Sequence, residues 1–413
     1  MPSLPTVQIA QNIADIDAAQ WDACANPATP SGALAVDGLG DIVEDVTQRE
    51  RFNPFVTHAF LKALETSKSV GGRSGWTPTH VLVENQAGRL MAVAPCYLKT
   101  HSMGEYVFDH AWADAYTRAG LDYYPKVQVC VPFTPATGRR LLVAADAEPM
   151  ALETLIAGLR AWRAKIDASS IHVTFPTKAE WEAMGASGFL QRTGQQFHFI
   201  NRGYENFDGF LDSLASRKRK MIKRERREAL ADGITIEPLR GAAITEEHWD
   251  AFFHFYMDTG SRKWGRPYLT RAFFSEIGAS MADRILLVMA KRDGKYIAGA
   301  INFIGDDALY GRNWGAIEEH PFLHFEVCYY QAIEFAIANG LARVEAGAQG
   351  EHKLARGYGA VPTYSAHDIP DKRFARAIDD YLQRERAAID EALEEYGELT
   401  PFKKTAVSGI ESA

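Results

Sequence analysis

The sequence predicts a mixed α/β (α+β) fold built from two tandem copies of one module, each a mixed, mainly antiparallel sheet flanked by helices. Three observations indicate this fold: the length of the chain, a short internal repeat, and the same order of strands and helices around both copies of the repeat. A chain of 413 residues is too long for one hydrophobic core and suits two domains of about 200 residues each. We therefore place the first module at residues 1–200 and the second at residues 201–413.

The repeat relates residues 54–61 to residues 267–274. The first segment reads Pro-Phe-Val-Thr-His-Ala-Phe-Leu and the second reads Pro-Tyr-Leu-Thr-Arg-Ala-Phe-Phe, so Pro, Thr, Ala and Phe recur in register. In each copy the threonine, Thr57 or Thr270, is placed to cap a helix that begins at the next residue.

The flanks of the two copies predict the same elements in the same order. In the second module, Asp293-Gly294 lies between two β-rich runs and indicates a hairpin, and Gly340 stands where a left-handed helix end is expected. Each half therefore reads β-α-α-β-β-β-α-β. The first half has strands at 6–10, 80–84, 90–98, 127–133 and 171–175, and helices near 16–25, beginning at 58, and at 150–164. The second has strands at 234–238, 285–290, 296–304, 308–315 and 341–347, helices near 249–256, beginning at 271, and at 325–338, and a helical tail at 371–396.

Composition and charge exclude several classes of protein. Apolar residues make up 46% of the chain and charged residues 24%, which is typical of a soluble globular protein. The net charge of −8 argues against a protein that binds nucleic acid over its whole surface, so any phosphate contact must come from a local patch. The four cysteines form no CxxC pair, and the sequence has neither a signal-peptide pattern nor an apolar run of about 18 residues. We expect a cytoplasmic protein without a transmembrane segment, and peripheral membrane contact stays open.

The order of elements resembles the core of the GNAT acyltransferase fold, and two such modules in tandem resemble the Fem-type (FemAB-like) transferases of peptidoglycan biosynthesis. The resemblance covers nearly the whole chain. It implies an N-acyltransferase that moves an activated acyl group onto a primary amine of a lipid or cell-envelope precursor. The donor, an acyl-CoA, an acyl-carrier thioester or an aminoacyl-tRNA, would be a co-substrate, with no cofactor tightly bound. A non-catalytic ligand-binding protein on a degenerate transferase fold is the alternative.

A strongly basic segment is predicted to form a helix over residues 211–230. Residues 217–227 hold eight cations and one anion, and an apolar stripe at helical spacing lets one face pack while the other stays cationic. A solvated charged face is the simplest interpretation. Fem-type enzymes have a similar basic helix at this place, which favours binding of phosphates from a nucleotide, a carrier, a lipid head group or a tRNA. The predicted substrate-binding residues here are Lys218, Arg219 and Arg224.

Polar residues follow the strand at 308–315 in the second module. GNAT folds place their chemistry where the middle strands separate, because unpaired backbone amides there can stabilise an oxyanion. An attacking ammonium must first lose a proton to a base of near-neutral pKa. The candidate bases are His320, His324 and Glu326, and the predicted substrate-binding residues are Arg312, Asn313 and Trp314.

The loop after the next strand is similar to a short Fem-type pattern of an acidic residue, a glycine, a lysine and an aromatic-glycine pair. Glu345, Gly347, Lys353 and Tyr358-Gly359 match it. The resemblance implies that Lys353 contacts substrate and that Glu345 shapes the catalytic pocket. Gln349 and His352 lie in the same loop and are predicted to bind substrate.

Three further segments are candidate binding sites. The sequence lacks the usual pyrophosphate loop of acetyl-CoA enzymes between Gly315 and Glu326, so another donor is favoured. A phosphate site or a plain surface turn is predicted at Thr137, Gly138, Arg139 and Arg140. An insertion at residues 100–125 is expected to form a wall of the acceptor pocket, because inserted loops are commonly lids or binding surfaces. Its predicted substrate-binding residues are Asp109, His110 and Trp112, with Arg262 and Lys263 opposite, and no histidine spacing suggests a metal site.

Overall fold

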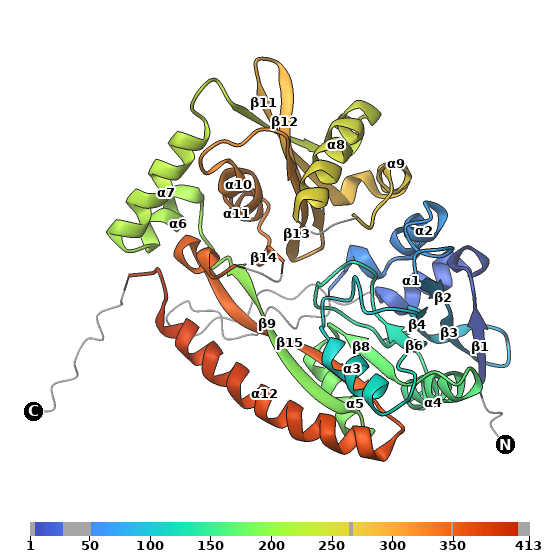
Figure 1. Ribbon diagram of the computed structural model, residues 1–413. Helices are drawn as coiled ribbons and strands as arrows, with labels where there is room; N and C mark the ends of the chain where they lie inside the picture. Colours follow the sequence, from blue (N-terminus) through green and yellow to red (C-terminus); the bar gives the residue numbers. More distant parts are fainter. Residues whose placement is uncertain (1–4, 28–50, 264–266, 348–349, 404–413) are drawn as a thin grey trace, which may run out of the picture.

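The computed structural model describes residues 5–27, 51–263, 267–347 and 350–403. Its strands form a four-stranded and an eleven-stranded sheet (Figure 1). Nearly all strand pairs are antiparallel, with β13–β14 and β6–β8 parallel. The small sheet has the order β1 (Thr6–Ala10), β3 (His80–Glu84), β4 (Leu90–Ala94) and β7 (Leu142–Val143). The large sheet has the order β10 (Thr235–Arg240), β11 (Ile285–Arg292), β12 (Lys295–Ile304), β13 (Ala308–Ala316), β14 (Arg343–Glu345), β9 (Leu190–Ile200), β15 (Tyr358–Asp368), β8 (Ile171–Thr174), β6 (Lys126–Val129), β5 (Cys96–Lys99) and β2 (Trp76–Pro78).

Helices cover both sheets, and the longest of them, α12, lies along β9 and β15 (Figure 1). No described helix is long and apolar enough to cross a membrane. The helices are α1 (Ala18–Ala25), α2 (His58–Thr66), α3 (His110–Arg118), α4 (Ala151–Lys165), α5 (Lys178–Ala186), α6 (Phe207–Ser213), α7 (Ser216–Ala229), α8 (Glu246–Lys263), α9 (Arg271–Met281), α10 (Leu323–Phe325), a π-helical turn (Glu326–Tyr330), α11 (Gln331–Ala338), a 3-10 helix (Glu351–Arg356) and α12 (Lys372–Glu398).

The two copies of the repeat pack against each other. Thr57 caps α2 as predicted, since its hydroxyl accepts a hydrogen bond from the Phe60 amide at 3.2 Å. Thr270 does not cap α9; its hydroxyl donates instead to the Ser67 carbonyl at 2.9 Å. Phe60 and Phe273 then meet edge to face at 5.7 Å, in a hydrophobic core that both halves of the chain share.

Two predicted turns are confirmed and one predicted strand is divided. Asp293 and Gly294 both have positive φ (51° and 75°), as a tight hairpin requires, and Gly340 ends α11 at φ 64°. The predicted strand at 90–98 is two strands, β4 and β5, which belong to different sheets. Pro95 lies between them and has no N–H to donate to a ladder.

The predicted basic helix at 211–230 is two helices, α6 and α7, separated at Leu214 and Ala215. Leu214 is fully buried and has an extended backbone (ψ 152°), so it packs into the core instead of continuing a helix. The tail predicted at 371–396 is α12, whose N-terminus is capped by the side chain of Asp371.

The large sheet joins the two predicted modules. β9, which ends at the predicted boundary of residue 200, lies between β14 and β15. β15 pairs along ten residues of β9 and then with β8 through Ser365–Asp368. A strand from the last sixth of the chain therefore completes the sheet of the first half.

Candidate functional site

The site lies where β13 and β14 separate. They pair in parallel only through Ala308, Leu309 and Tyr310 of β13, after which β14 ends and β13 continues to Ala316. A cavity of about 750 Å³ opens beside this part of β13. Both halves of the chain line it, through the insertion (102–108), β9 (192–196), β15 (363–365), β13 (312–314), α8 with residues 267–269, the π-helical turn, and Lys353.

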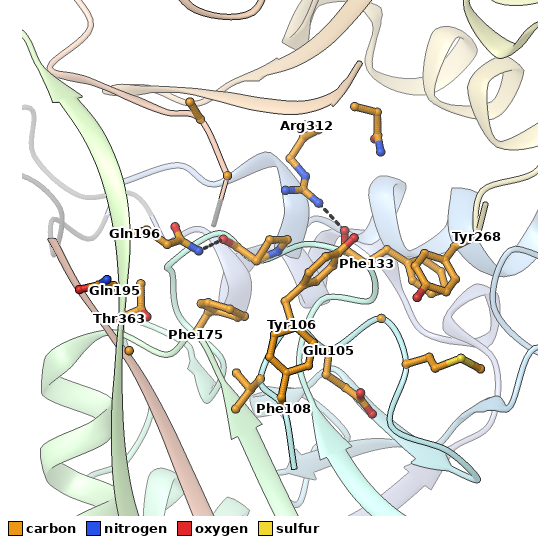
Figure 2. A pocket seen from close by; sticks show the side chains of 18 of the residues that line it. Glu105, Tyr106, Phe108, Phe133, Phe175, Gln195, Gln196, Tyr268, Arg312 and Thr363 are labelled. Carbon is orange, nitrogen blue, oxygen red and sulfur yellow. Dashed lines mark hydrogen bonds between the residues drawn. The ribbon is translucent and has the colours of Figure 1, made fainter. Parts of the chain in front are cut away.

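A β-bulge aims Arg312 into the cavity. Ile301 of β12 pairs with Asn313 and Asn302 pairs with Gly311, which leaves Arg312 as the extra residue. Its guanidinium donates a hydrogen bond to the backbone carbonyl of Phe133, in the first half of the chain, and interacts with the hydroxyl of Tyr106 (Figure 2). Burial lowers the pKa of Arg312, so the cavity holds a cation that is only partly hydrated.

The alternation of hydrogen bonds along β13 fixes the direction of the Trp314 amide. The Ile317 amide donates to the Ile297 carbonyl of β12. The Ala316 amide points the other way and donates to the Thr259 hydroxyl at 3.1 Å. Trp314 is two residues before Ala316, and the pairing with β12 is regular from Asn313 to Ala316, so the two amides point to the same side of the strand. The Trp314 N–H therefore points away from β12, on the side where the strands separate.

Helix α10 and the π-helical turn that follows it bring ring side chains to the cavity. Wide turns of this kind are frequent at functional sites. His324 lines the cavity with its ring 5.2 Å from Trp314 and 5.3 Å from Tyr329. The Tyr329 hydroxyl is 3.0 Å from Nε2 of His352. Burial raises the pKa of Tyr329 and, with the neighbouring Arg356 and Lys353 charges, lowers the pKa of His352, so the phenol stays protonated.

Lys353 is a buried cation at the same end of the cavity. It is 2% exposed, and its Nζ donates to the carbonyls of Ala346 (2.6 Å) and Gly347 (3.0 Å). Its Nζ also lies 5.8 Å from the centre of the Tyr329 ring. Burial lowers the pKa of Lys353 to about 8, so the ammonium gives up its proton far more readily than an exposed lysine.

The comparisons with known proteins identify the family. Residues 12–404 match the FemAB-like family, which is described by peptidoglycan biosynthesis or recognition. The chain belongs to the FemAB-like family. FemX is similar in structure, with a TM-score of 0.50 and 14% identity over 81% of this chain and 96% of that one. No curated protein matches the chain. The family match and the likeness to FemX confirm the predicted family and the predicted tandem fold.

Two further solved structures are similar to this FemAB-like chain. A tandem GNAT protein from the clavulanic acid biosynthesis pathway has a TM-score of 0.43 and 11% identity, over 88% of this chain and 98% of that one. L-PGS from Bacillus licheniformis has a TM-score of 0.48 and 8% identity, over 81% of this chain and 97% of that one.

Of the four predicted catalytic residues of the FemAB-like chain, His324 alone is among the residues that line the cavity. Glu326 is fully buried on the other face of the π-helical turn, where Arg226 binds it through Nε at 3.0 Å and Nη2 at 2.9 Å. His320 lies outside the cavity and contacts Glu318 at 2.8 Å. These two placements differ from the prediction: an ion pair with Arg226 engages the buried Glu326, and the partly exposed His320 contacts the partly exposed Glu318.

Glu345 lies behind the cavity instead of lining it. The carboxylate is 3% exposed, contacts Nε of Arg343 at 3.0 Å, and has His198 at 3.8 Å. Burial raises its pKa, although Arg343 opposes this effect. Its contacts hold β14 against its neighbours, which suits the predicted role of shaping the pocket without contact to substrate.

Several predicted substrate-binding residues do line the cavity: Arg312, Asn313, Trp314, Lys353 and His110. His352 is next to Lys353 and reaches the site through Tyr329. Asp109 and Trp112 do not line it. Asp109 is buried in an ion pair with Lys126 and accepts a hydrogen bond from the Tyr123 hydroxyl, and Trp112 packs against His367. Gln349 lies outside the described residues.

The cations predicted on the basic segment are on the protein surface, away from the cavity lining. Lys218 and Arg219 are half-buried on α7, where Arg219 binds Asp212 at 2.9 Å, and Arg224 is exposed near Glu228. Arg262 is exposed at the end of α8 and bonds to Asp258 and the Ala316 carbonyl. Lys263 is the last residue of α8, and its side chain lies outside the described part of the chain.

The predicted phosphate loop is a structural turn of the FemAB-like fold. Arg140 is 1% exposed and donates to four backbone carbonyls, among them Thr174 at 3.0 Å and Ala136 at 2.6 Å. Arg139 donates to the carbonyls of Cys24 and Val143. Thr137 and Gly138 border a void of about 10 Å³. The guanidiniums that would bind a phosphate are thus engaged by the backbone, which favours the turn over the phosphate site.

Sequence reasoning missed the residues of β9 and β15 that form one side of the cavity. Gln195, Gln196 and Thr363 lie there (Figure 2), and Gln196 donates to the Pro135 carbonyl at 2.6 Å. The polar run Gln191–Gln196 lacks the apolar alternation by which a strand is recognised. It also missed Tyr329 of the π-helical turn, which lines the cavity.

Proposed function

We propose that this FemAB-like protein is an N-acyltransferase in which an amine attacks an activated acyl or aminoacyl carbonyl inside the cavity. The observation that carries the proposal is the separation of β13 from β14, because it leaves a strand edge, a cation and the imidazole of His324 around one cavity. Acyl transfer needs these parts: a base for the amine, donors for the oxyanion, and a proton for the leaving group.

His324 is the proposed base. It lines the cavity next to Trp314, and neutral imidazole is the side chain best suited to take a proton from an ammonium near pH 7. The neutral amine nitrogen forms a C–N bond to the carbonyl carbon, and the ammonium of the tetrahedral intermediate so formed gives one proton to His324. Glu326 and His320 are not proposed for this step, since neither lines the cavity.

The oxyanion of the tetrahedral intermediate is proposed to lie at the edge of β13. The Trp314 N–H points to this side, and the bulge presents the Arg312 guanidinium beside it. A backbone amide held by a sheet is preorganised, so it stabilises developing charge without moving. Removing one such donor from an oxyanion site typically costs about 10²–10³ in rate.

The leaving group takes up a proton as its bond to the carbonyl carbon breaks. Tyr329 is the proposed donor, and its oxygen regains a proton from the protonated His324, whose ring centre lies 5.3 Å from that of Tyr329. One proton thus passes from the amine to the leaving group. Lys353 borders the same end of the cavity and would neutralise charge on the leaving thiolate or hydroxyl.

The donor can be a thioester or an aminoacyl-tRNA, and the surface of α7 distinguishes them. Its exposed cations are Arg217, Lys220, Lys223, Arg224 and Arg227. A tRNA bound by several such cations loses affinity steeply with salt. The double change Arg217→Glu and Lys220→Glu, at two of these exposed cations, would then lower the slope of log K against log salt by about 2. A thioester donor would show little change.

The test is a transfer assay with the full chain. Each donor, an acyl-CoA, an acyl-carrier thioester or an aminoacyl-tRNA, is incubated with a panel of primary amines, and amide products are measured by mass spectrometry. We expect an amide from one donor class, with loss of product in Trp314→Pro, which removes the N–H, and retention in Trp314→Ala, which keeps it. Saturable ligand binding with no amide from any donor would overturn the enzyme and support the ligand-binding alternative.

A further inference from the structure

One side of the cavity is lined by five aromatic side chains, Tyr106, Phe108, Phe133, Phe175 and Tyr268, which we call the aromatic wall (Figure 2). The mechanism proposed above uses none of them for proton transfer. They come from the insertion, from loops after β6 and β8, and from the segment before α9. Rings gathered from four separate segments indicate a binding surface assembled by the fold.

Three of these residues have a left-handed backbone conformation, which residues with a bulky side chain rarely adopt. Tyr106, Phe133 and Phe175 have φ of 60°, 58° and 56°. A left-handed backbone at a bulky residue is an outlier that persists only where the surrounding structure enforces it, and such outliers cluster at ligand sites. Their occurrence together on one cavity wall points to selection for the position of the rings.

The centre of the aromatic wall is rigid. Phe133 and Tyr268 stack with ring centres 4.7 Å apart and planes 7° from parallel, and Trp76 meets Phe133 edge to face from behind at 5.3 Å. Trp76 is 1% exposed and thus belongs to the core. A ligand on this surface therefore meets a fixed apolar plane, so little side-chain entropy is lost on binding.

The outer edge of the aromatic wall exposes apolar surface to solvent. Phe108 is 66% exposed, Met103 in the same inserted segment is 51% exposed, and Tyr268 is 38% exposed. All three line the cavity. Apolar surface at the mouth of a pocket marks a binding site for apolar groups, because covering it removes apolar area from water, which is favourable in free energy.

The buried charges beside the aromatic wall, of which Glu105 itself lines the cavity, argue against a cation as its ligand. Glu105 lies between Lys99 (3.4 Å) and Lys126 (3.3 Å), and Lys126 also pairs with Asp109. Two lysines and two carboxylates balance, so this cluster presents no net negative charge to the cavity. An aromatic cage for an ammonium would need uncompensated negative charge or open ring faces, and the Phe133 face is already covered by Tyr268.

We propose that the aromatic wall binds the hydrocarbon chain of one of the two substrates, with its reactive end at His324 and its tail leaving the cavity past Met103 and Phe108. The inference rests on the proposed function only for what the reactive end does. The chain belongs either to the acyl donor or to the amine, and both have the same chemistry at this surface. The cavity accordingly selects substrates by chain length.

The experiment measures binding without turnover by calorimetry on the full chain. The probes are butyl-, hexyl- and octylamine in one arm and butanoyl-, hexanoyl- and octanoyl-CoA in the other, each below its micelle concentration. Burial of each methylene tightens binding about fourfold, so two methylenes tighten it by roughly an order of magnitude. We expect this dependence in one arm, which identifies the substrate that carries the chain. Equal affinity along both series would overturn the proposal.

Matched variants connect the effect to the aromatic wall. Phe108→Ser is expected to lower octyl or octanoyl affinity about tenfold and to leave the butyl probe unchanged, whereas Leu399→Ser, at a residue that is 62% exposed outside the cavity, changes neither. Met103→Ser and Met150→Ser, 51% and 52% exposed, form a second pair. Chain-length dependence that survives both wall variants would overturn the proposal.

The two proposals fail separately. Chain-length-dependent binding without any amide product would leave the aromatic wall standing and overturn the proposed transfer. Amide formation with no dependence on chain length would support the proposed transfer and overturn the role of the aromatic wall.

Discussion

Arg312, the extra residue of the bulge in β13, donates a hydrogen bond to the backbone carbonyl of Phe133, whose own backbone is left-handed. The contact joins the second half of the chain to the first across the cavity (Figure 2). One guanidinium thus borders the proposed oxyanion position and also holds the central ring of the aromatic wall. Reaction centre and chain-binding surface are positioned by the same side chain.

Arg312→Met should lower the free energy of unfolding by about 2 kcal/mol, because a hydrogen bond to a charged group is lost and the Phe133 carbonyl loses its partner. Denaturant unfolding checks this. Arg373→Met is the control, since the Arg373 side chain is 79% exposed and pairs only with Asp371, and it should change stability by less than about 0.5 kcal/mol. Equal effects of the two changes would show that the Phe133 contact contributes nothing.

Lys353 should make stability rise with pH. Its pKa is about 8 in the folded protein against an ordinary value of 10.5, so between these values the unfolded chain binds more protons and the free energy of unfolding increases with pH. The gain between pH 8 and pH 10 is about 2 kcal/mol. Unfolding of wild type and Lys353→Met, measured at both values, should show the difference between them change by this amount. Parallel pH profiles would contradict the assignment.

His324→Gln should lower kcat by about 10²–10⁴-fold with little change in substrate affinity, because the proposed base is removed while the cavity keeps its shape. His320→Gln is a matched control four residues away, where the ring contacts Glu318 outside the cavity. Steady-state transfer kinetics compare the two. A similar loss in both variants, or none in either, would exclude His324 as the base.

Glu326→Gln should destabilise the fold by about 3 kcal/mol, because it leaves Arg226 without its buried carboxylate partner. Glu334 binds the same arginine at 2.8 Å but is 47% exposed, so Glu334→Gln should cost less than about 1 kcal/mol. Thermal unfolding measures both. If Glu326→Gln kept full stability and lost activity alone, Glu326 would act in the chemistry after all.

The sequence predicted most elements because local patterns determine them. The Asp293-Gly294 turn, the Thr57 cap and the Gly340 helix end follow from single residues with strong backbone preferences. It did not predict β9 and β15 as a pair, because their long register depends on contacts between residues about 160 positions apart in the chain, such as Gly359 with His198.

Local patterns also predicted part of the site. Arg312 and Trp314 lie in the last part of β13, and His324 and Lys353 follow β13 and β14, where a sheet commonly presents ligand-binding groups. Glu326 and Arg140 are of the right type for the assigned chemistry, but whether a charged group faces a cavity or an internal partner is decided by packing from distant segments, which no local pattern encodes.

The pairing of β15 with β8 sets an order on synthesis. Ile171–Thr174 emerges from the ribosome almost 200 residues before its partner, Ser365–Asp368, so the first half cannot complete its sheet while it is being made. Until then β8 keeps one exposed edge, which is an aggregation hazard in a nascent chain. Expression of residues 1–200 alone should therefore give insoluble protein. A pause in translation between the two modules would not help the first module to fold, because β15 has not yet been made.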